Sequence, residues 1–188
     1  VPHFVEAEET SLGVDPDALA AYLSRIAVCR EGSTVNTQTG RVIRALMPVH
    51  VFGHPCRMEE LSRVAAEYGL LLVEDATEAL GSSAHGKKVG STHTAVFSFN
   101  GNKIITTGGG GAVVTHDEAL YQKIKHLTTT AKLAHPWAFD HDQVAFNYRL
   151  PNLNAALGCA QLEQLPRFVA AKRALAARYV EAFRNVPG

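Results

Sequence analysis

Residues 70–75 read Leu-Leu-Leu-Val-Glu-Asp, four apolar residues followed directly by two acids. A short run that is apolar throughout is typical of a strand covered on both faces in a parallel sheet. The preceding residues, about 57–68, have apolar side chains at helical spacing, and Gly69 predicts the end of that helix. In open α/β sheets, ligands bind at the carboxyl ends of strands, which is where Glu74 and Asp75 stand.

The same alternation of strands and helices continues on both sides of this stretch. Asp15 followed by Pro16 predicts the start of a helix, because the side chain caps it and proline suits its first position. Helices are also expected over residues 117–129, 152–164 and 166–185. Extended segments are expected near residues 3–6, 42–49, 84–89, 95–99 and 112–115, with a loop or hairpin over 30–41. The pattern predicts an α/β domain with a largely parallel sheet.

The composition of the chain limits the class of protein and the partners that can be expected. The chain has 188 residues, 46% of them hydrophobic, with 18 basic and 18 acidic side chains, which fits one globular domain. A neutral chain gives no electrostatic reason to expect a nucleic-acid or membrane-surface partner. No apolar run approaches the ~20 residues that span a bilayer, and no signal peptide is visible, so we expect a cytoplasmic protein. The three widely spaced cysteines predict buried free thiols, not a disulfide framework.

Two residues are candidates for chemistry. Asp75 could bind a metal, act as a general base, pair with a cationic ring nitrogen, or only cap a helix. Lys103 follows Phe-Ser-Phe-Asn-Gly-Asn over residues 97–102 and precedes four glycines at 108–111. A lysine desolvated in such a loop has a lowered pKa, which activates it for imine formation with an aldehyde. A solvated lysine in a flexible turn is the alternative.

Other motifs give weaker evidence for a binding site. Residues 81–87 nearly spell a phosphate-binding loop, but Lys88 stands where the magnesium-binding hydroxyl is needed. No Gly-x-Gly-x-x-Gly follows a strand, so dinucleotide binding has no support. His135 and His141 lie six residues apart in a loop and form no helical metal-binding pair, so we expect no metal site.

Three segments resemble a known family in order and spacing: residues 74–81, Glu-Asp-Ala-Thr-Glu-Ala-Leu-Gly; residues 97–107, which contain Asn-Gly-Asn-Lys-Ile-Ile-Thr-Thr; and residues 146–150, Phe-Asn-Tyr-Arg-Leu. They resemble the DegT/DnrJ/EryC1/StrS sugar aminotransferases, which are fold-type-I pyridoxal-phosphate (PLP) enzymes. Residues 48–55 and 152–163 match too, so the resemblance covers the whole chain. The sequence around Lys103 and the insertion at residues 30–41 most resemble the branch of the family that makes legionaminic acid or bacillosamine precursors.

The resemblance assigns roles to individual residues. Lys103 would hold PLP as a Schiff base and later shuttle a proton between substrate and cofactor. Asp75 would pair with the protonated pyridine nitrogen and keep the ring able to take up electrons. Asp75 stands 23 residues before Ser98, which would bind the cofactor phosphate, and 28 before Lys103, as the family spacing requires.

Two further positions follow from the same motifs. Glu78 occupies the place that contacts the ring hydroxyl, where many relatives have glutamine. Asn147, with Arg149 nearby, matches a segment that reaches the phosphate site of the neighbouring subunit in relatives, which implies a homodimer with shared active sites.

The family pattern implies a three-layer, aspartate-aminotransferase-like large domain, incomplete at both ends. Residues 1–165 would be a partial PLP-binding core and residues 166–188 a long helix leading to a small C-terminal domain, so we expect a central segment of a longer chain. The implied reaction moves an amino group from L-glutamate to C4 of a nucleotide-linked 4-keto-6-deoxy sugar. The alternatives are a truncated, inactive module that at most dimerises, and a related PLP sugar dehydratase, in which histidine replaces the lysine.

Overall fold

The structure is a computed structural model that describes residues 2–187. It divides into two compact units. The first contains the residues up to Phe97 together with Ala112–Arg149, and the second contains Ser98–Gly111 and the residues from Leu150 onward. Each unit is described by itself.

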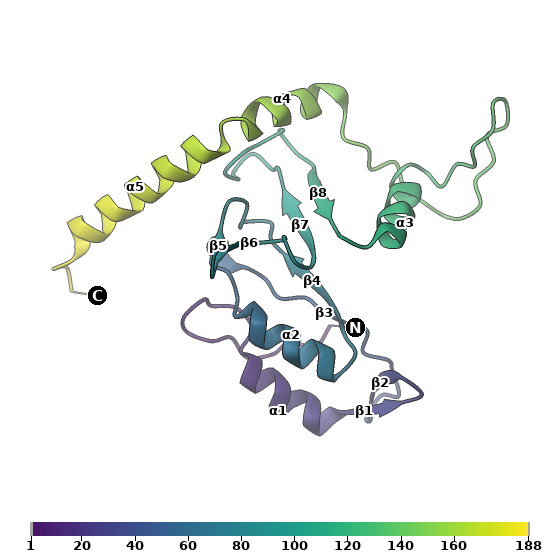
Figure 1. Ribbon diagram of the computed structural model, residues 1–188, viewed down its shortest axis with the longest axis horizontal. Coiled ribbons are helices and arrows are strands. Elements are labelled where there is room, and N and C mark those ends of the chain that lie inside the picture. Colours follow the sequence, from purple (N-terminus) through teal and green to yellow (C-terminus); the bar gives the residue numbers. More distant parts are fainter. Residues whose placement is uncertain (1, 188) are drawn as a thin grey trace. The chain divides into compact units, whose positions relative to one another are not determined.

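A four-stranded sheet organises the first unit, in the order β3 (Ala45–Leu46), β4 (Leu71–Asp75), β7 (Thr94–Ser98) and β8 (Gly111–Val114). The end residues Ser98 of β7 and Gly111 of β8 belong to the second unit. The β3–β4 and β4–β7 pairs are parallel, which confirms the predicted sheet type. Figure 1 shows β4 and β7 running side by side. Parallel strands have their carboxyl ends at the same edge of a sheet, and ligands of open α/β sheets bind at that edge. The carboxyl end of β4 is therefore the expected position of a site.

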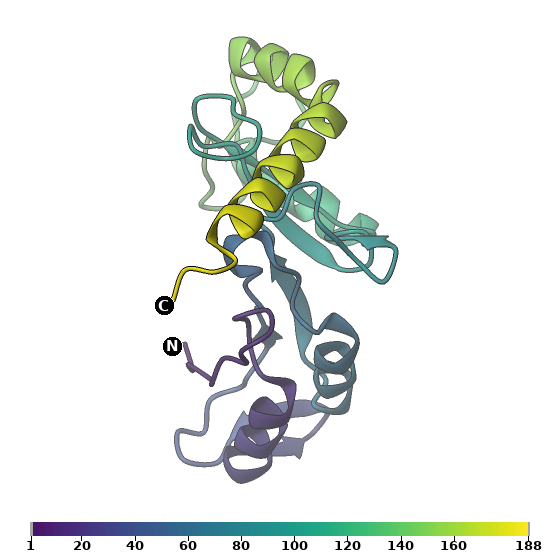
Figure 2. The ribbon, with the colours of Figure 1, turned by 90° about the vertical axis from the view of Figure 1, so that its left-hand side faces the viewer.

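Two helices, α1 (Pro16–Ile26) and α2 (Met58–Glu67), form the core with this sheet and lie side by side in both Figures 1 and 2. The Asp15 carboxylate accepts hydrogen bonds from the first turn of α1, as predicted. Gly69 has φ +60° and ends α2 in the left-handed conformation that favours glycine. The buried cluster between these elements consists of Leu19, Leu23, Leu46, Cys56, Leu61, Val64 and Ala65.

Leu61 is fully buried in this cluster, so Leu61→Ala is expected to destabilise the protein by ~2–5 kcal/mol through lost contacts and a residual cavity. The free energy of unfolding in urea measures the loss. Leu175→Ala on an exposed helix surface is the matched control and is expected to change stability by less than ~1 kcal/mol. Equal effects of the two changes would contradict the assigned core.

Shorter elements complete the first unit. Its two hairpins join β1 (Ala27–Arg30) to β2 (Ser33–Asn36) and β5 (Ser83–Ala84) to β6 (Lys87–Lys88). They confirm the extended pieces predicted around residues 30–41 and 84–89. A 3₁₀ turn, η1 (Val51–Gly53), follows the bridge between Val49 and Asp75. Helix α3 (Glu118–Thr128) begins after Asp117, whose side chain caps it.

The second unit consists of a loop and two helices, α4 (Asn152–Leu162) and the long α5 (Leu165–Phe183), which Figure 2 shows following one another. Both helices were predicted, and a proline, Pro166, lies in the first turn of α5, where it is well tolerated. No helix within residues 2–187 is long and apolar enough to cross a membrane.

Several local predictions were wrong. Residues 3–6 form no strand. They are followed by a bridge between Ala7 and Val14 and by a turn in which the Glu8 side chain accepts a hydrogen bond from the Ser11 N–H. The expected 42–49 strand is not continuous: Ala45–Leu46 pair with β4, Val49 makes a separate parallel bridge to Asp75, and Val42 bridges Val35. Leu71 is 71% exposed, so β4 is not covered on both faces by the described residues. Cys29 and Cys159 are exposed, and only Cys56 is a buried thiol.

Candidate active site

Asp75 is held at the carboxyl end of β4 by two main-chain hydrogen bonds to residues 48–50. Its N–H donates to the Pro48 carbonyl at 2.8 Å, and its carbonyl accepts from the His50 N–H at 3.0 Å. The side-chain Oδ1 accepts from the Thr77 N–H at 3.1 Å. Oδ2 accepts no hydrogen bond from any residue of the described chain, so the carboxylate is oriented while one oxygen remains available to a donor.

Glu78, three residues further on, contacts the turn η1. Its Oε2 accepts from the Phe52 N–H at 2.9 Å. Phe52 and Gly53 both have positive φ, and a Cβ on Gly53 would lie 2.8 Å from the Glu78 carbonyl oxygen. This close approach requires glycine at 53. The contact of Glu78 with a ring hydroxyl stays a prediction.

The second unit contains Ser98 and Lys103 in one closed loop. The Phe99 N–H donates to Gly110 and the Thr107 N–H donates back to Phe99, so the ends of the loop are fixed. The Lys103 N–H donates to the Asn100 carbonyl at 3.1 Å. Ser98 Oγ accepts from the Asn100 N–H at 3.3 Å, which leaves its hydroxyl proton to donate elsewhere.

Helix α4 braces this loop with side chains that sequence reasoning missed. The Asn154 amide donates to the Thr107 carbonyl, and Gln161 Oε1 accepts from the Thr106 N–H at 3.1 Å. A Cβ on Gly158 would lie 2.9 Å from Thr107 Cγ2, so the helix approaches closely there. The positions 154, 158 and 161 lie on one helical face and within the 152–163 segment that resembles the family, but neither signal assigned them a role.

Asn147 lies on an exposed segment of the first unit that pairs with the end of α3. Phe146 and Tyr148 donate their N–H groups to the carbonyls of Leu127 and Thr128, and their rings stack at 5.0 Å. Asn147 Oδ1 accepts from Arg149 Nε at 2.9 Å. The two side chains named from the family motif are therefore joined, and their reach into a neighbouring subunit stays a prediction.

Glu74 is buried and accepts three hydrogen bonds, which sequence reasoning did not foresee. The donors are His50 Nε2 at 2.9 Å, His93 Nδ1 at 3.1 Å and the Gly90 N–H at 3.1 Å. Burial alone would raise the pKa of this carboxyl, but the bonds from His50, His93 and Gly90 outweigh burial and lower it. Glu74 is therefore ionised near neutral pH.

Two influences on His50 oppose each other. Burial disfavours a positive ring, whereas Cys56 and Glu74 favour one and raise the pKa of His50 to about 9. However, the Cys56 N–H points at Nδ1 from 3.1 Å, and it can donate only to an unprotonated nitrogen. Because two facing N–H donors would both stay unpaired in a buried site, the neutral ring with its proton on Nε2 fits the geometry.

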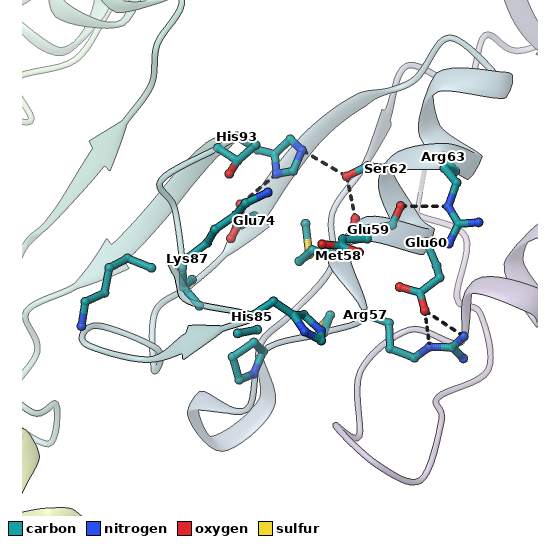
Figure 3. A pocket seen from close by; sticks show the side chains of 16 residues that line it. Arg57, Met58, Glu59, Glu60, Ser62, Arg63, Glu74, His85, Lys87 and His93 are labelled. Carbon is teal, nitrogen blue, oxygen red and sulfur yellow. Dashed lines mark hydrogen bonds and ion pairs between the residues drawn. The ribbon is translucent and has the colours of Figure 1, made fainter.

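A pocket of about 540 Å³ lies beside this network in the first unit, between α2 and the β5–β6 hairpin. Figure 3 shows Glu74, His93 and Ser62 on its wall. Ser62 Oγ lies 3.1 Å from His93 Nε2. Neither Asp75 nor Glu78 lines the pocket, so it is separate from the predicted cofactor residues.

The lowered pKa of Glu74 predicts a loss of stability in acid. Because the folded pKa lies below the unfolded value of 4.5, the stabilisation is complete above about pH 4.5 and is lost as the pH falls through the folded pKa. Glu74→Gln, which does not titrate, should show a flatter decline below about pH 5. Urea unfolding across this range measures the difference, and parallel curves for the two proteins would contradict the prediction.

The chain as a whole is similar to known proteins in sequence and in fold. The family model described as DegT/DnrJ/EryC1/StrS aminotransferase family matches residues 1–188. GDP-perosamine synthase of Escherichia coli O157:H7 is 44% identical over 72% of this chain and 37% of its own length. Two solved structures are also similar. Helicobacter pylori PseC, an aminotransferase of pseudoaminic acid biosynthesis, has a TM-score of 0.84 and 28% identity over 100% of this chain and 46% of its own. DesV of S. venezuelae, solved in complex with a ketimine intermediate, has a TM-score of 0.81 and 31% identity over 98% and 45%.

The chain spans less than half the length of these relatives, and over that span it has their fold. The predicted α/β class and the resemblance drawn from three short motifs are thereby confirmed. With a family model that matches every residue, the chain belongs to the DegT/DnrJ/EryC1/StrS aminotransferase family.

Proposed function

We propose that this protein is a PLP-dependent aminotransferase that moves an amino group from L-glutamate to C4 of a nucleotide-linked 4-keto-6-deoxy sugar. The observation that supports it most is the family match over residues 1–188. The name of the relative from Escherichia coli, GDP-perosamine synthase, favours a nucleotide-linked sugar as substrate. The branch that makes legionaminic acid or bacillosamine precursors is the proposed subgroup.

The residues present fit the proposed cofactor. Oδ2 of Asp75 is open to a ring N–H, while Oδ1 is held by Thr77. The hydroxyl proton of Ser98 is available to a phosphate oxygen.

Each residue then has a distinct task. When bound, PLP supplies the electron sink of the reaction. Lys103 would hold the cofactor through its side-chain amine, and the same amine would accept a proton from the donor's α-carbon and donate one to C4 of the sugar. Asp75 holds the proton on the ring nitrogen, because an ionised carboxylate favours a cationic neighbour.

Asn147 and Arg149 are proposed to act in a homodimer. Their segment is exposed, and its main chain is fixed by bonds to Leu127 and Thr128. It can therefore present two polar side chains to a neighbouring subunit without refolding. In the proposed dimer they bind the cofactor phosphate of the partner subunit.

The test is an assay of the protein with PLP, L-glutamate and a nucleotide-linked 4-keto-6-deoxy sugar. The proposal predicts one 2-oxoglutarate formed for each amino sugar. Loss of a sugar hydroxyl without amination would assign the chain to the dehydratase branch. A folded protein that forms neither product would overturn the proposal in favour of an inactive, dimerising module.

A further inference from the structure

We infer that Glu74 and His50 are positioning residues for Asp75: the buried carboxylate of Glu74 holds His50, and His50 holds the main chain of residue 75. The inference rests on the proposed function, in which Asp75 pairs with the cofactor ring nitrogen. It names two residues that do not touch the cofactor but fix the residue that does.

The Glu74–His50 pair is almost completely shielded from water. The side chains are 4% and 0% exposed, and His50 Nε2 lies 2.9 Å from Glu74 Oε2. The Gly90 N–H donates to the same oxygen at 3.1 Å, and the Cys56 N–H donates to the other nitrogen of the His50 ring. With both ring nitrogens bonded, His50 has one orientation.

His50 is bonded to both residues at the end of β4. Its side chain donates to Glu74, and its main-chain N–H donates to the Asp75 carbonyl at 3.0 Å. Successive side chains of a strand point to opposite faces, so Glu74 and Asp75 face away from each other. The influence of Glu74 on Asp75 therefore passes through the main chain, by way of His50.

His93 provides a control within the same network. It donates to the other carboxylate oxygen of Glu74, and its second nitrogen lies near Ser62, as Figure 3 shows. His93 has no hydrogen bond to residue 75. His93→Ala therefore removes a bond of comparable length from Glu74 while the link from His50 to Asp75 stays intact.

Substitutions at Glu74 distinguish the effect of its hydrogen bond to His50 from the effect of its negative charge. In Glu74→Gln the amide oxygen can accept from His50 and Gly90, and the amide N–H₂ can face His93, whose ring can accept through Nδ1. The link to His50 is thus kept although the charge is lost. Glu74→Leu removes the acceptor altogether, and His50→Phe breaks the same link from its other end.

Two measurements on the full protein test the inference. Amide hydrogen exchange at His50 and Asp75 reports the main-chain bonds without any cofactor. Titration with PLP gives its dissociation constant. Glu74→Leu and His50→Phe are expected to speed exchange at both amides and to weaken PLP binding, each by about tenfold, which corresponds to one net hydrogen bond. Glu74→Gln and His93→Ala should change neither quantity by more than about threefold.

The outcomes distinguish the inference from a purely structural role and from failure of the proposed function. If all four variants lower the melting temperature but leave exchange at Asp75 unchanged, the inference is wrong. Faster exchange with unchanged PLP binding would also overturn it, because the clamp would then not serve the cofactor. If the unmodified protein binds no PLP, the proposed function fails, and so does the cofactor role of the clamp, while exchange still reports whether the clamp exists.

Discussion

Lys103→Ala is expected to abolish imine formation with PLP and to reduce amino transfer by at least ~10²–10⁴-fold, the contribution of positioned proton transfer alone. Alanine can neither form the imine nor move a proton, so both losses come from one change. The first loss is measured by the absorbance of the imine-bound cofactor and by the disappearance of that absorbance when borohydride reduces the imine. A product assay with L-glutamate measures the second.

Lys123→Ala is the matched control for this experiment. Lys123 is an exposed residue of α3, outside the loop that carries Lys103. It should keep both absorption and turnover. Imine absorption that survives in Lys103→Ala would show that another amine holds the cofactor and that the lysine assignment is wrong.

Asp75→Asn is expected to lower turnover by roughly 10²–10³-fold, the usual cost of losing one preorganised electrostatic partner. The asparagine oxygen can keep the bond from the Thr77 N–H, so the local structure should survive. The neutral amide cannot hold a proton on the pyridine nitrogen, so the electron sink is weakened. Turnover and the dissociation constant for PLP should be measured together.

Glu78→Gln is the comparison for Asp75→Asn, since it makes the same change from acid to amide three residues away. Its amide oxygen can still accept from the Phe52 N–H. Turnover close to that of the unmodified protein is expected. If Glu78→Gln lowers turnover more than Asp75→Asn does, Glu78 and not Asp75 would be the partner of the ring nitrogen.

Local pattern predicted the elements whose signals lie within a few residues. The apolar run before Glu74 predicted β4, and Asp15, Gly69 and Asp117 predicted three helix ends through caps and turns that the structure confirms. These signals depend on neighbours in the chain, so no tertiary information was needed. The candidate acid at the end of β4 followed from the strand itself.

Signals that depend on distant partners were missed or misread. The two histidine donors to Glu74 come from 24 and 19 residues away. His50 lies in the 48–55 segment that resembles the family, but nothing in the sequence pairs it or His93 with Glu74. The 3–6 strand was wrong because apolar residues form a ladder only where a neighbouring strand accepts their hydrogen bonds. For the same reason the 42–49 segment pairs with β4 only at Ala45–Leu46 and, through an isolated bridge, at Val49.

Reduction of the PLP-loaded protein with borohydride, followed by peptide mapping, addresses the central assignment most directly. The chain contains seven lysines, and the reduced pyridoxyl group should be found on Lys103 alone. A label on any other lysine, or a folded protein that takes up no label, would contradict the account.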